Sequence, residues 1–214
     1  MCILTIYLVR HGEAWHNVDS SVMNKAHDSQ HNLTEIGQEQ AKETAEFLKD
    51  ILHERTVFYS SPYKRALQTA QAIREALPNE VPLYENPLLR EWELGNLYDV
   101  NDRPPEVKKE YKAAGRFYFR FRNGESLADV YLRGNVFANA VLQRLLNQQR
   151  YEDIVIVSHA GFMHLFMTVL MQLPEQKVEN FTLLESIENA SVLQLNEKDD
   201  GTYGYKKIFV PSIK

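Results

Sequence analysis

The sequence has little of several features that would place it in a specialised class of protein. Its 214 residues include one cysteine, Cys2, so no disulfide bond can form within the chain, which fits a reducing compartment. Basic residues are not in excess, and the formal net charge is −5. A surface of this sign argues against nucleic acid or an acidic membrane as a partner of the whole molecule.

Long apolar segments are also missing from the sequence. The first nine residues are mostly apolar, but no basic region precedes them and Arg10 follows at once, which does not fit a secretory signal. The apolar run over 162–173 is short and is interrupted by His164 and Thr168, so it does not fit a membrane span. We therefore expect a cytoplasmic protein, or one shared between cytoplasm and nucleus.

The composition and the alternation of patterns are those of an α/β protein. With 44% hydrophobic and 25% charged residues, the chain is neither disordered nor fibrous, and its length suits one domain with a substantial core. Strand-like apolar runs alternate with helical patterns, which predicts a three-layer α/β/α sandwich with a mainly parallel central sheet. We expect residues 1–214 to form a single domain, with an insertion over the active site at about 86–123.

The boundaries of the expected elements follow from periodicity and punctuation. Strands are predicted at 3–9, 57–60, 81–85, 154–158, 191–195 and 205–210, and a turn at 199–201 joins the last two. Helices are predicted at 33–53, 62–77, 126–149 and 161–172, with a shorter one after the turn at 103–105. Ser61 is the predicted cap of the second helix, with Pro62 in its first turn. The polar segment 12–32 shows no period and is predicted to be a loop over the pocket.

Three of the predicted strands end in residues suited to phosphate. Arg10 and His11 follow the first strand, Arg65 lies just beyond the second, and His159 follows the fourth. Ligands of open α/β sheets bind outside the carboxyl ends of the strands, so neighbouring strands would direct both imidazoles into one pocket. An arginine at a helix N-terminus meets an anion with its guanidinium and with free backbone N–H groups.

Such a pocket equips a histidine for nucleophilic attack on phosphorus. His11 can attack if the reacting nitrogen is unprotonated and the other ring nitrogen donates a hydrogen bond that fixes the tautomer. Arg10, Arg65 and His159 would hold the phosphoryl oxygens, because phosphoryl transfer depends on positioning and charge stabilisation. His159 serves this role best as an imidazolium while His11 stays neutral, so we expect the pKa values of the two imidazoles to differ.

The leaving alkoxide needs a proton, and the segment 88–95 offers two carboxylic acids. Glu91 is the candidate donor, because burial and an approaching phosphate dianion favour the protonated form of a carboxyl group. Glu93 is the competitor, and residue types alone do not separate the two.

These residues lie in motifs that resemble a known family. The chain contains R-H-G-E at 10–13 with Asn17 downstream, N-L-T-x-x-G-x-x-Q-A at 32–41, S-S-P-x-x-R-A-x-Q-T-A at 60–70, L-R-E at 89–91 with Gly95, and V-S-H-A-G at 157–161. In this order they resemble the histidine phosphatase superfamily, which has the phosphoglycerate mutase-like fold. The resemblance covers the chain from residue 6 to about residue 161.

The resemblance implies a role for each matching residue. It implies His11 as the nucleophile, Arg10, Arg65 and His159 as the phosphate pocket, and Asn17 as a further phosphate or substrate contact. It also favours Glu91 over Glu93, because the acid of this motif follows L-R directly.

Departures from the pattern affect the expected substrate more than the chemistry. Ala160, a predicted substrate-binding position, stands where many members have glycine. The pair at 15–16 and the residues at 96–99 also differ from the usual ones. The physiological substrate therefore stays open.

Two other groups of residues have competing interpretations. Four histidines outside the motifs are candidate metal ligands, but they do not have the spacing of zinc ligands, so we expect no metal site; they are His16, His27, His31 and His164. The basic and aromatic segment 116–122, from Arg116 to Arg122, fits core packing, a contact with a distal anionic group of the substrate, or nucleic acid, of which the last is least favoured.

Three candidate functions are consistent with the sequence. The first is a phosphomonoester hydrolase that acts on a small phosphorylated metabolite through a phosphohistidine. The alternative is a cofactor-dependent phosphoglycerate mutase, in which 2,3-bisphosphoglycerate is the primer; otherwise no cofactor is expected. The third is an inactive phosphate-binding module, which the complete motif set disfavours. The compact chain and the residues after Glu91 favour the hydrolase, and a homodimer is left open.

Overall fold

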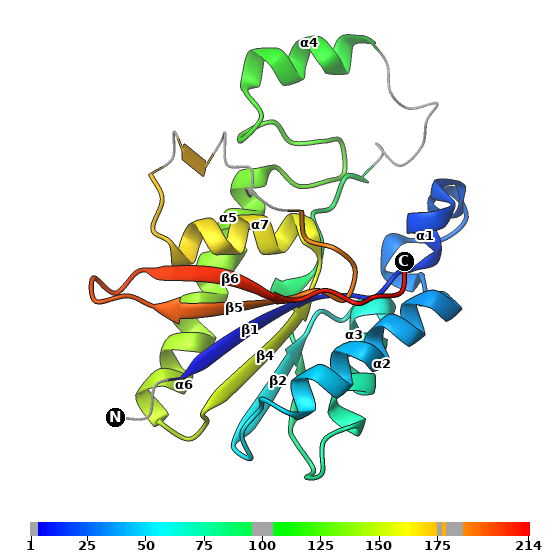
Figure 1. Cartoon of the computed structure of the whole chain (residues 1–214). Helices are drawn as coiled ribbons and strands as arrows, with labels where there is room; N and C mark the ends of the chain where they lie inside the picture. The colour runs from blue at the N-terminus through cyan, green and yellow to red at the C-terminus, as the bar shows by residue number, and fades with distance from the viewer. Residues whose placement is uncertain (1–3, 96–104, 175–176, 179–185) are drawn as a thin grey trace.

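The computed structural model describes residues 4–95, 105–174, 177–178 and 186–214. Its centre is a six-stranded sheet in the order β3-β2-β4-β1-β5-β6 (Figure 1). The strands are β1 (Thr5–Arg10), β2 (Thr56–Ser60), β3 (Leu83–Glu85), β4 (Asp153–Ser158), β5 (Val192–Glu197) and β6 (Tyr203–Phe209). The first four run parallel to one another, and β5 and β6 are antiparallel to their neighbours. The expectation of a mainly parallel sheet is therefore confirmed.

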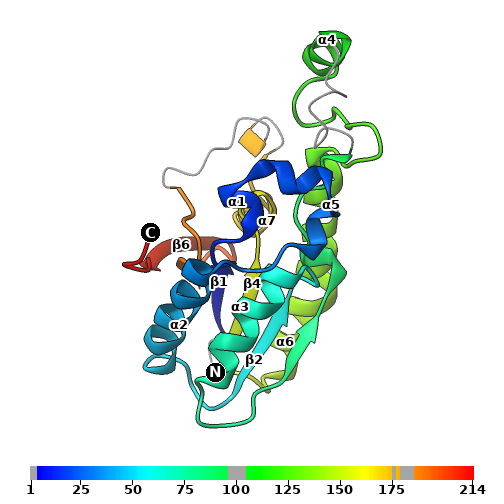
Figure 2. The same cartoon turned by 90° about the vertical axis from the view of Figure 1, so that its right-hand side faces the viewer.

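Helices cover both faces of the sheet, which gives the predicted three layers (Figures 1 and 2). One face carries α2 (Glu35–Lys49) and α3 (Lys64–Glu75), and the other carries α5 (Leu127–Phe137), α6 (Gln143–Gln148) and α7 (Ala160–Leu170). A π-helical stretch, Ala138–Leu142, joins α5 to α6. The helix α4 (Pro105–Ala114) lies outside the three layers (Figure 1).

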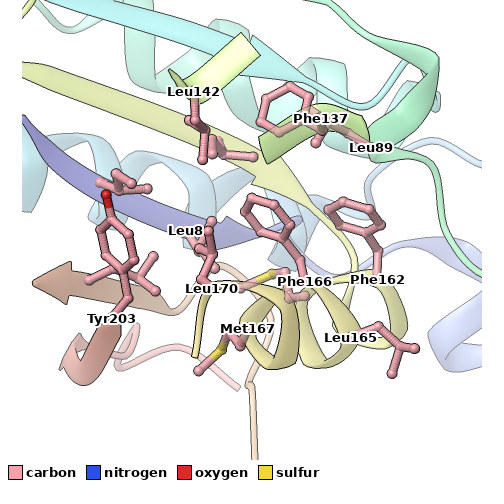
Figure 3. Packing of buried hydrophobic residues seen from close by; sticks show 14 of the residues in the cluster. Leu8, Leu89, Phe137, Leu142, Phe162, Leu165, Phe166, Met167, Leu170 and Tyr203 are labelled. Atoms are coloured by element: carbon pink, nitrogen blue, oxygen red, sulfur yellow. The ribbon is translucent and has the colours of Figure 1, made fainter. Parts of the chain in front are cut away.

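Two apolar clusters hold the layers together, one on each face of the sheet. Successive side chains of a strand point to opposite faces, so Ile156 of β4 joins the cluster under α5 and α7, whereas Val157 joins the one under α2 and α3. Figure 3 shows the first cluster, in which Phe137 of α5 lies edge-on to Phe166 of α7 with ring centroids 5.8 Å apart. Burial of β4 along its whole length is typical of a central parallel strand.

Two local expectations near the strand ends are wrong. The helix α3 begins at Lys64 with Tyr63 as its N-cap residue, so Ser61 does not cap it and Pro62 precedes it. The segment 12–32 is not a plain loop, because it contains the short helix α1 (Trp15–Val18) and 3₁₀ turns at Ser20–Asn24 and Asp28–Gln30. Single turns of this kind are held by local side-chain bonds rather than by an apolar period, so periodicity does not reveal them.

Other local predictions are confirmed. Ser126 and Asp129 form the expected capping box at the start of α5, each side chain accepting the backbone N–H of the other. The β5–β6 turn contains Gly201 at φ 77°, a conformation that favours glycine. The departures expected at 96–99, and most of the turn at 103–105, lie outside the described residues.

The basic and aromatic segment 116–122 buries its phenylalanines and exposes its arginines and its tyrosine. Phe117, Phe119 and Phe121 are buried, whereas Tyr118 and the arginines Arg116, Arg120 and Arg122 are exposed. Packing thus accounts for the three phenylalanines of the pattern. Within the ranges that the structure describes, no helix combines the length and the apolar character needed to cross a membrane.

Candidate active site

The carboxyl ends of β1 and β4 bring two histidines together. The strands are adjacent and parallel, with Arg10 opposite Ser158, so His11 and His159 follow at equivalent positions. The His11 backbone N–H donates to Ser158 O at 2.9 Å, and the two imidazole centroids are 5.1 Å apart. The two rings that were predicted to share a pocket therefore lie side by side.

His11 is held as a neutral imidazole with its Nε2 lone pair free of a proton. Its ring is buried, and Nδ1 lies 2.7 Å from Gly12 O, a carbonyl that can only accept, so the proton sits on Nδ1. Arg65 Nε donates to His11 Nε2 at 3.2 Å, which agrees with this tautomer. Burial, followed by the charges of Arg65 and Arg10, holds the pKa of His11 well below its usual value. These contacts agree with the neutral state expected of His11.

His159 lies in surroundings that favour the neutral imidazole. Its Nε2 lies 2.8 Å from Ser61 Oγ, and Nδ1 has no hydrogen-bond partner in the described part of the chain. Burial, and then the charge of Arg65, also hold the pKa of His159 well below its usual value. The imidazolium is predicted for a ring with a phosphoryl anion beside it, because an anion favours the charged form, and that state stays a prediction.

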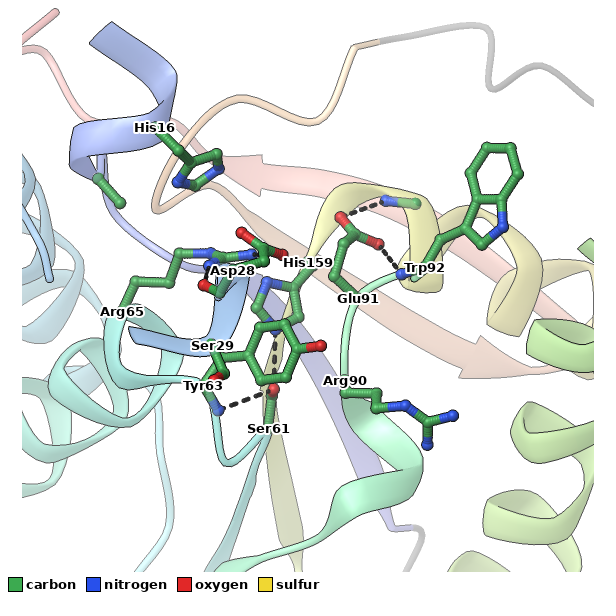
Figure 4. A network of polar contacts seen from close by, with 12 residues as sticks. His16, Asp28, Ser29, Ser61, Tyr63, Arg65, Arg90, Glu91, Trp92 and His159 are labelled. Atoms are coloured by element: carbon green, nitrogen blue, oxygen red, sulfur yellow. Dashed lines mark hydrogen bonds and ion pairs between the residues drawn. The ribbon is translucent and has the colours of Figure 1, made fainter. Parts of the chain in front are cut away.

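The two predicted phosphate-binding arginines lie beside His11 and are fixed by the protein. Arg10 Nη1 donates to Ile187 O at 2.7 Å. Arg65, which is 1% exposed, donates from Nη1 to Asp28 O at 2.6 Å and from Nη2 to Asp28 Oδ2 at 2.9 Å. Asp28 itself is 3% exposed (Figure 4). Sequence reasoning had no reason to single out Asp28, because its partner is far away in the chain.

Glu91 lies at the N-terminus of α7, directly beyond His159 (Figure 4). Its Oε1 accepts the N–H groups of Trp92 and Phe162 at 2.9 Å each, and Oε2 accepts that of Gly161 at 3.2 Å. A Cβ on Gly161 would come within 2.5 Å of Oε1, so this approach requires glycine. The structure thus places Glu91 next to the histidine pair.

Glu93, the competing acid, is engaged elsewhere. Its Oε2 lies 3.3 Å from His27 Nε2, and its Oε1 accepts the N–H of Gly95 at 2.8 Å. This arrangement ties Glu93 to the 3₁₀ turns and to its own loop rather than to the start of α7. Geometry therefore supports the choice of Glu91 that the motif suggested.

Arg133 of α5 clamps the segment that carries Glu91. Its Nη1 donates to Leu88 O at 2.7 Å and to Arg90 O at 2.8 Å, and its Nη2 donates to Glu91 O at 3.0 Å. Glu125 accepts from Nε and Nη2 at 3.1 Å each, which compensates the buried charge of Arg133. Sequence reasoning missed this residue, because nothing in a helical pattern distinguishes it from a surface arginine.

Asn17 and Ala160 take peripheral places. Asn17 is exposed, and its Oδ1 accepts the Ala14 N–H at 3.0 Å, which caps the start of α1. Asn189 Nδ2 links it to the nucleophile, donating to His11 O at 3.0 Å and to Asn17 Oδ1 at 3.4 Å. Ala160 is the first residue of α7 and can offer a substrate only its backbone and a methyl group.

More imidazoles extend from the pair toward the segment 12–32. The ring of His16 lies 5.7 Å from that of His11, and the ring of His31 lies 5.9 Å from that of His16. Burial and the nearby arginine lower the pKa of His16 to about 4. Among the residues whose structure is described, no cluster of three or more His, Cys, Asp or Glu could hold a metal ion.

The suppressed imidazole pKa values predict a stability that falls with acid. Below about pH 6.5, an unfolded chain protonates its histidines, whereas the buried His11 and His159 stay neutral in the fold. The unfolded state then binds more protons, and the free energy of unfolding falls by up to about 1.4 kcal/mol per pH unit for each group. Between pH 7 and pH 5, we expect thermal denaturation in phosphate-free buffer to show a clear fall in Tm. His159→Gln is the matched control, because its Tm should fall less steeply with decreasing pH. An unchanged wild-type Tm would contradict the lowered pKa values of the two histidines.

Comparison with known proteins places the chain in a family. The family model described as the histidine phosphatase superfamily (branch 1) matches residues 6–205. The phosphoglycerate mutase-like protein AT74 of Arabidopsis thaliana is 31% identical over 213 residues, which cover 92% of this chain and 66% of that protein. The broad-range acid phosphatase DET1 of Saccharomyces cerevisiae is 24% identical over an alignment of 295 residues, which covers 94% of this chain and 87% of the yeast protein.

A solved structure agrees with the fold. Mycobacterial glucosyl-3-phosphoglycerate phosphatase superposes with a TM-score of 0.73 at 23% identity, covering 95% of this chain and 97% of that one. This chain spans about two thirds of the length of the Arabidopsis relative. The match of a family model to most of the sequence decides the assignment: the chain belongs to branch 1 of the histidine phosphatase superfamily.

Proposed function

We propose that this chain hydrolyses the phosphomonoesters of small metabolites through a phosphohistidine at His11. The observation that carries the proposal is the state of that imidazole. Its Nδ1–H is held by Gly12 O, and its Nε2 lone pair points to the guanidinium of Arg65, inside a pocket shared with His159. A neutral nucleophile beside fixed cations is suited to attack on a phosphoryl group that those cations hold.

In the first step, His11 Nε2 bonds to phosphorus and the phosphorus–oxygen bond to the leaving group breaks. Arg10, Arg65 and His159 hold the phosphoryl oxygens, and the bound anion favours the charged form of His159. Glu91 gives its proton to the departing alkoxide, which leaves as an alcohol.

In the second step, water attacks the phosphohistidine. Glu91, now a carboxylate, takes a proton from the attacking water as the new phosphorus–oxygen bond forms. The phosphorus–nitrogen bond breaks, and its electron pair returns to His11 Nε2. Inorganic phosphate leaves, and both His11 and Glu91 regain their starting states.

A mutase is the second candidate, because the Arabidopsis relative is named phosphoglycerate mutase-like. The two reactions share the first step and differ in whether water or a sugar-acid hydroxyl takes the phosphoryl group. We therefore test purified protein with p-nitrophenyl phosphate and, separately, with 3-phosphoglycerate plus a trace of 2,3-bisphosphoglycerate. Release of phosphate without isomerisation supports the hydrolase, and rapid isomerisation supports the mutase. If neither reaction is observed, the result contradicts both functions.

Turnover is expected to be faster at mildly acidic pH than at alkaline pH. The proton donor Glu91 must carry its proton at the moment of attack, whereas the low pKa of His11 keeps the nucleophile neutral in weak acid. The pH profile of kcat/KM for an alkyl phosphate, measured over the range in which the protein stays folded, checks this. A flat profile from acid to alkaline conditions would count against the role of Glu91.

A further inference from the structure

We propose that Asp28 is a positioning residue that presents one particular edge of the Arg65 guanidinium to the phosphoryl group on His11. The inference rests on the proposed function for its reaction, and on the contacts of Asp28 and Arg65 for its geometry. Asp28 lies in a 3₁₀ turn of the segment 12–32, and Figure 4 shows it against the head of Arg65, on the side of His159.

The contacts divide the five N–H groups of Arg65 between two edges. The end edge, made of Nη1 and Nη2, is occupied by Asp28 through its backbone O at 2.6 Å and its Oδ2 at 2.9 Å. The side edge contains Nε–H, which donates to His11 Nε2 at 3.2 Å, and the second N–H of Nη2, which points the same way. A phosphoryl group bonded to His11 Nε2 would therefore meet a two-donor edge, the geometry that binds phosphate oxygens in a bidentate manner.

Burial makes Asp28 necessary for this arrangement. The Arg65 and Asp28 side chains are 1% and 3% exposed, so water cannot replace either as a partner. The carboxylate compensates the buried guanidinium charge, and the two-point contact fixes the plane of the guanidinium. Without Asp28, the end edge of Arg65 is unpaired and free to rotate toward the pocket.

The same contact could be read as a gate, in which Asp28 competes with phosphate for Arg65. The two interpretations predict opposite changes in phosphate affinity when Asp28 is removed. If Asp28 is a gate, its removal strengthens phosphate binding, whereas if it is a positioning residue, its removal weakens phosphate binding. The side edge toward His11 is not occupied by Asp28, which favours positioning.

The test measures binding of inorganic phosphate and of vanadate by calorimetry, together with kcat and KM for p-nitrophenyl phosphate. For Asp28→Ala, we expect affinity for both anions to fall about tenfold or more, with a parallel loss in kcat/KM. Asp28→Asn retains a side-chain acceptor for Nη2, so it should recover part of the anion affinity. Asp19→Asn is the matched control, because Asp19 belongs to the same segment and accepts local hydrogen bonds from Ser21.

The outcomes separate this inference from the proposed function. Tighter anion binding by Asp28→Ala, or unchanged affinity in a variant that circular dichroism shows to be folded, overturns the positioning role. If Asp28→Ala does not fold, Asp28→Asn carries the same comparison. Calorimetry needs no turnover. Wild-type protein whose phosphate affinity depends on Asp28, but which never forms a phosphohistidine, would therefore contradict the proposed function and leave this inference standing.

Discussion

Replacing His11 with alanine is expected to reduce turnover by about 10⁴-fold or more, because the variant has no atom that can take the phosphoryl group. Nε2 of His11 is the nitrogen whose lone pair the structure keeps unprotonated, and Arg65 Nε points at it from 3.2 Å. His159 differs from His11 in that its Nε2 is engaged by a hydrogen bond with Ser61 Oγ at 2.8 Å. Steady-state hydrolysis of p-nitrophenyl phosphate measures the loss.

The matched control for this substitution is His16→Ala. His16 is a neighbouring imidazole in the same part of the pocket, with its ring 5.7 Å from that of His11 and no assigned part in the reaction. We expect this variant to keep the capacity to form the phosphoenzyme. Retention of more than a small fraction of activity by His11→Ala would refute the assignment of the nucleophile.

Replacing Glu91 with glutamine is expected to slow the hydrolysis of alkyl phosphates by about 10²–10⁴-fold, the usual worth of a general acid. The effect should be much smaller for p-nitrophenyl phosphate, because the p-nitrophenolate leaving group needs little help from a proton. Dependence on the leaving group is the signature of proton donation, since a simple disturbance of the loop would slow both substrates by one factor. The measurement is single-turnover phosphorylation of the enzyme by each substrate.

Glu93→Gln provides the control for the acid assignment. It removes the neighbouring carboxylate, which contacts His27 and Gly95 instead of the start of α7. We expect its rates to stay near those of the wild type with both substrates. A loss that depends on the leaving group in Glu93→Gln, but not in Glu91→Gln, would reverse the two roles.

The sequence predicts most of the fold and the ends of its strands, for a physical reason. A central parallel strand is a short run of β-branched residues, and β1 and β4 both show it before their histidines. Motifs in a fixed order then added the residues that we expect to bind phosphate. Each of these signals depends only on residues that are close together in the sequence.

The parts that sequence reasoning missed depend on partners far apart in the chain. Asp28 contacts Arg65, and Arg133 contacts the carbonyl groups of 88–91; neither pairing leaves a local pattern. Ser61 shows the same limit in reverse. Its local preference is to cap α3, but the fold uses its hydroxyl for His159 and for the N–H of Tyr63.

The charge of His159 required knowledge of its surroundings in three dimensions. The residue type and a future phosphate suggested an imidazolium, but the finished fold buries the ring beside Arg65 and lowers its pKa. Burial and the distribution of charge arise only when strands, helices and the segment 12–32 have come together.

Trapping the covalent intermediate is the sharpest test of a phosphohistidine at His11. Wild-type enzyme is mixed with a ³²P-labelled phosphomonoester and stopped in alkali within the first turnover, and the labelled peptide is then mapped. We expect a label that is stable in alkali, lost in acid, carried by the peptide that contains His11, and missing from His11→Ala. Active enzyme that yields no such label, or yields it on His159, would refute nucleophilic attack by His11.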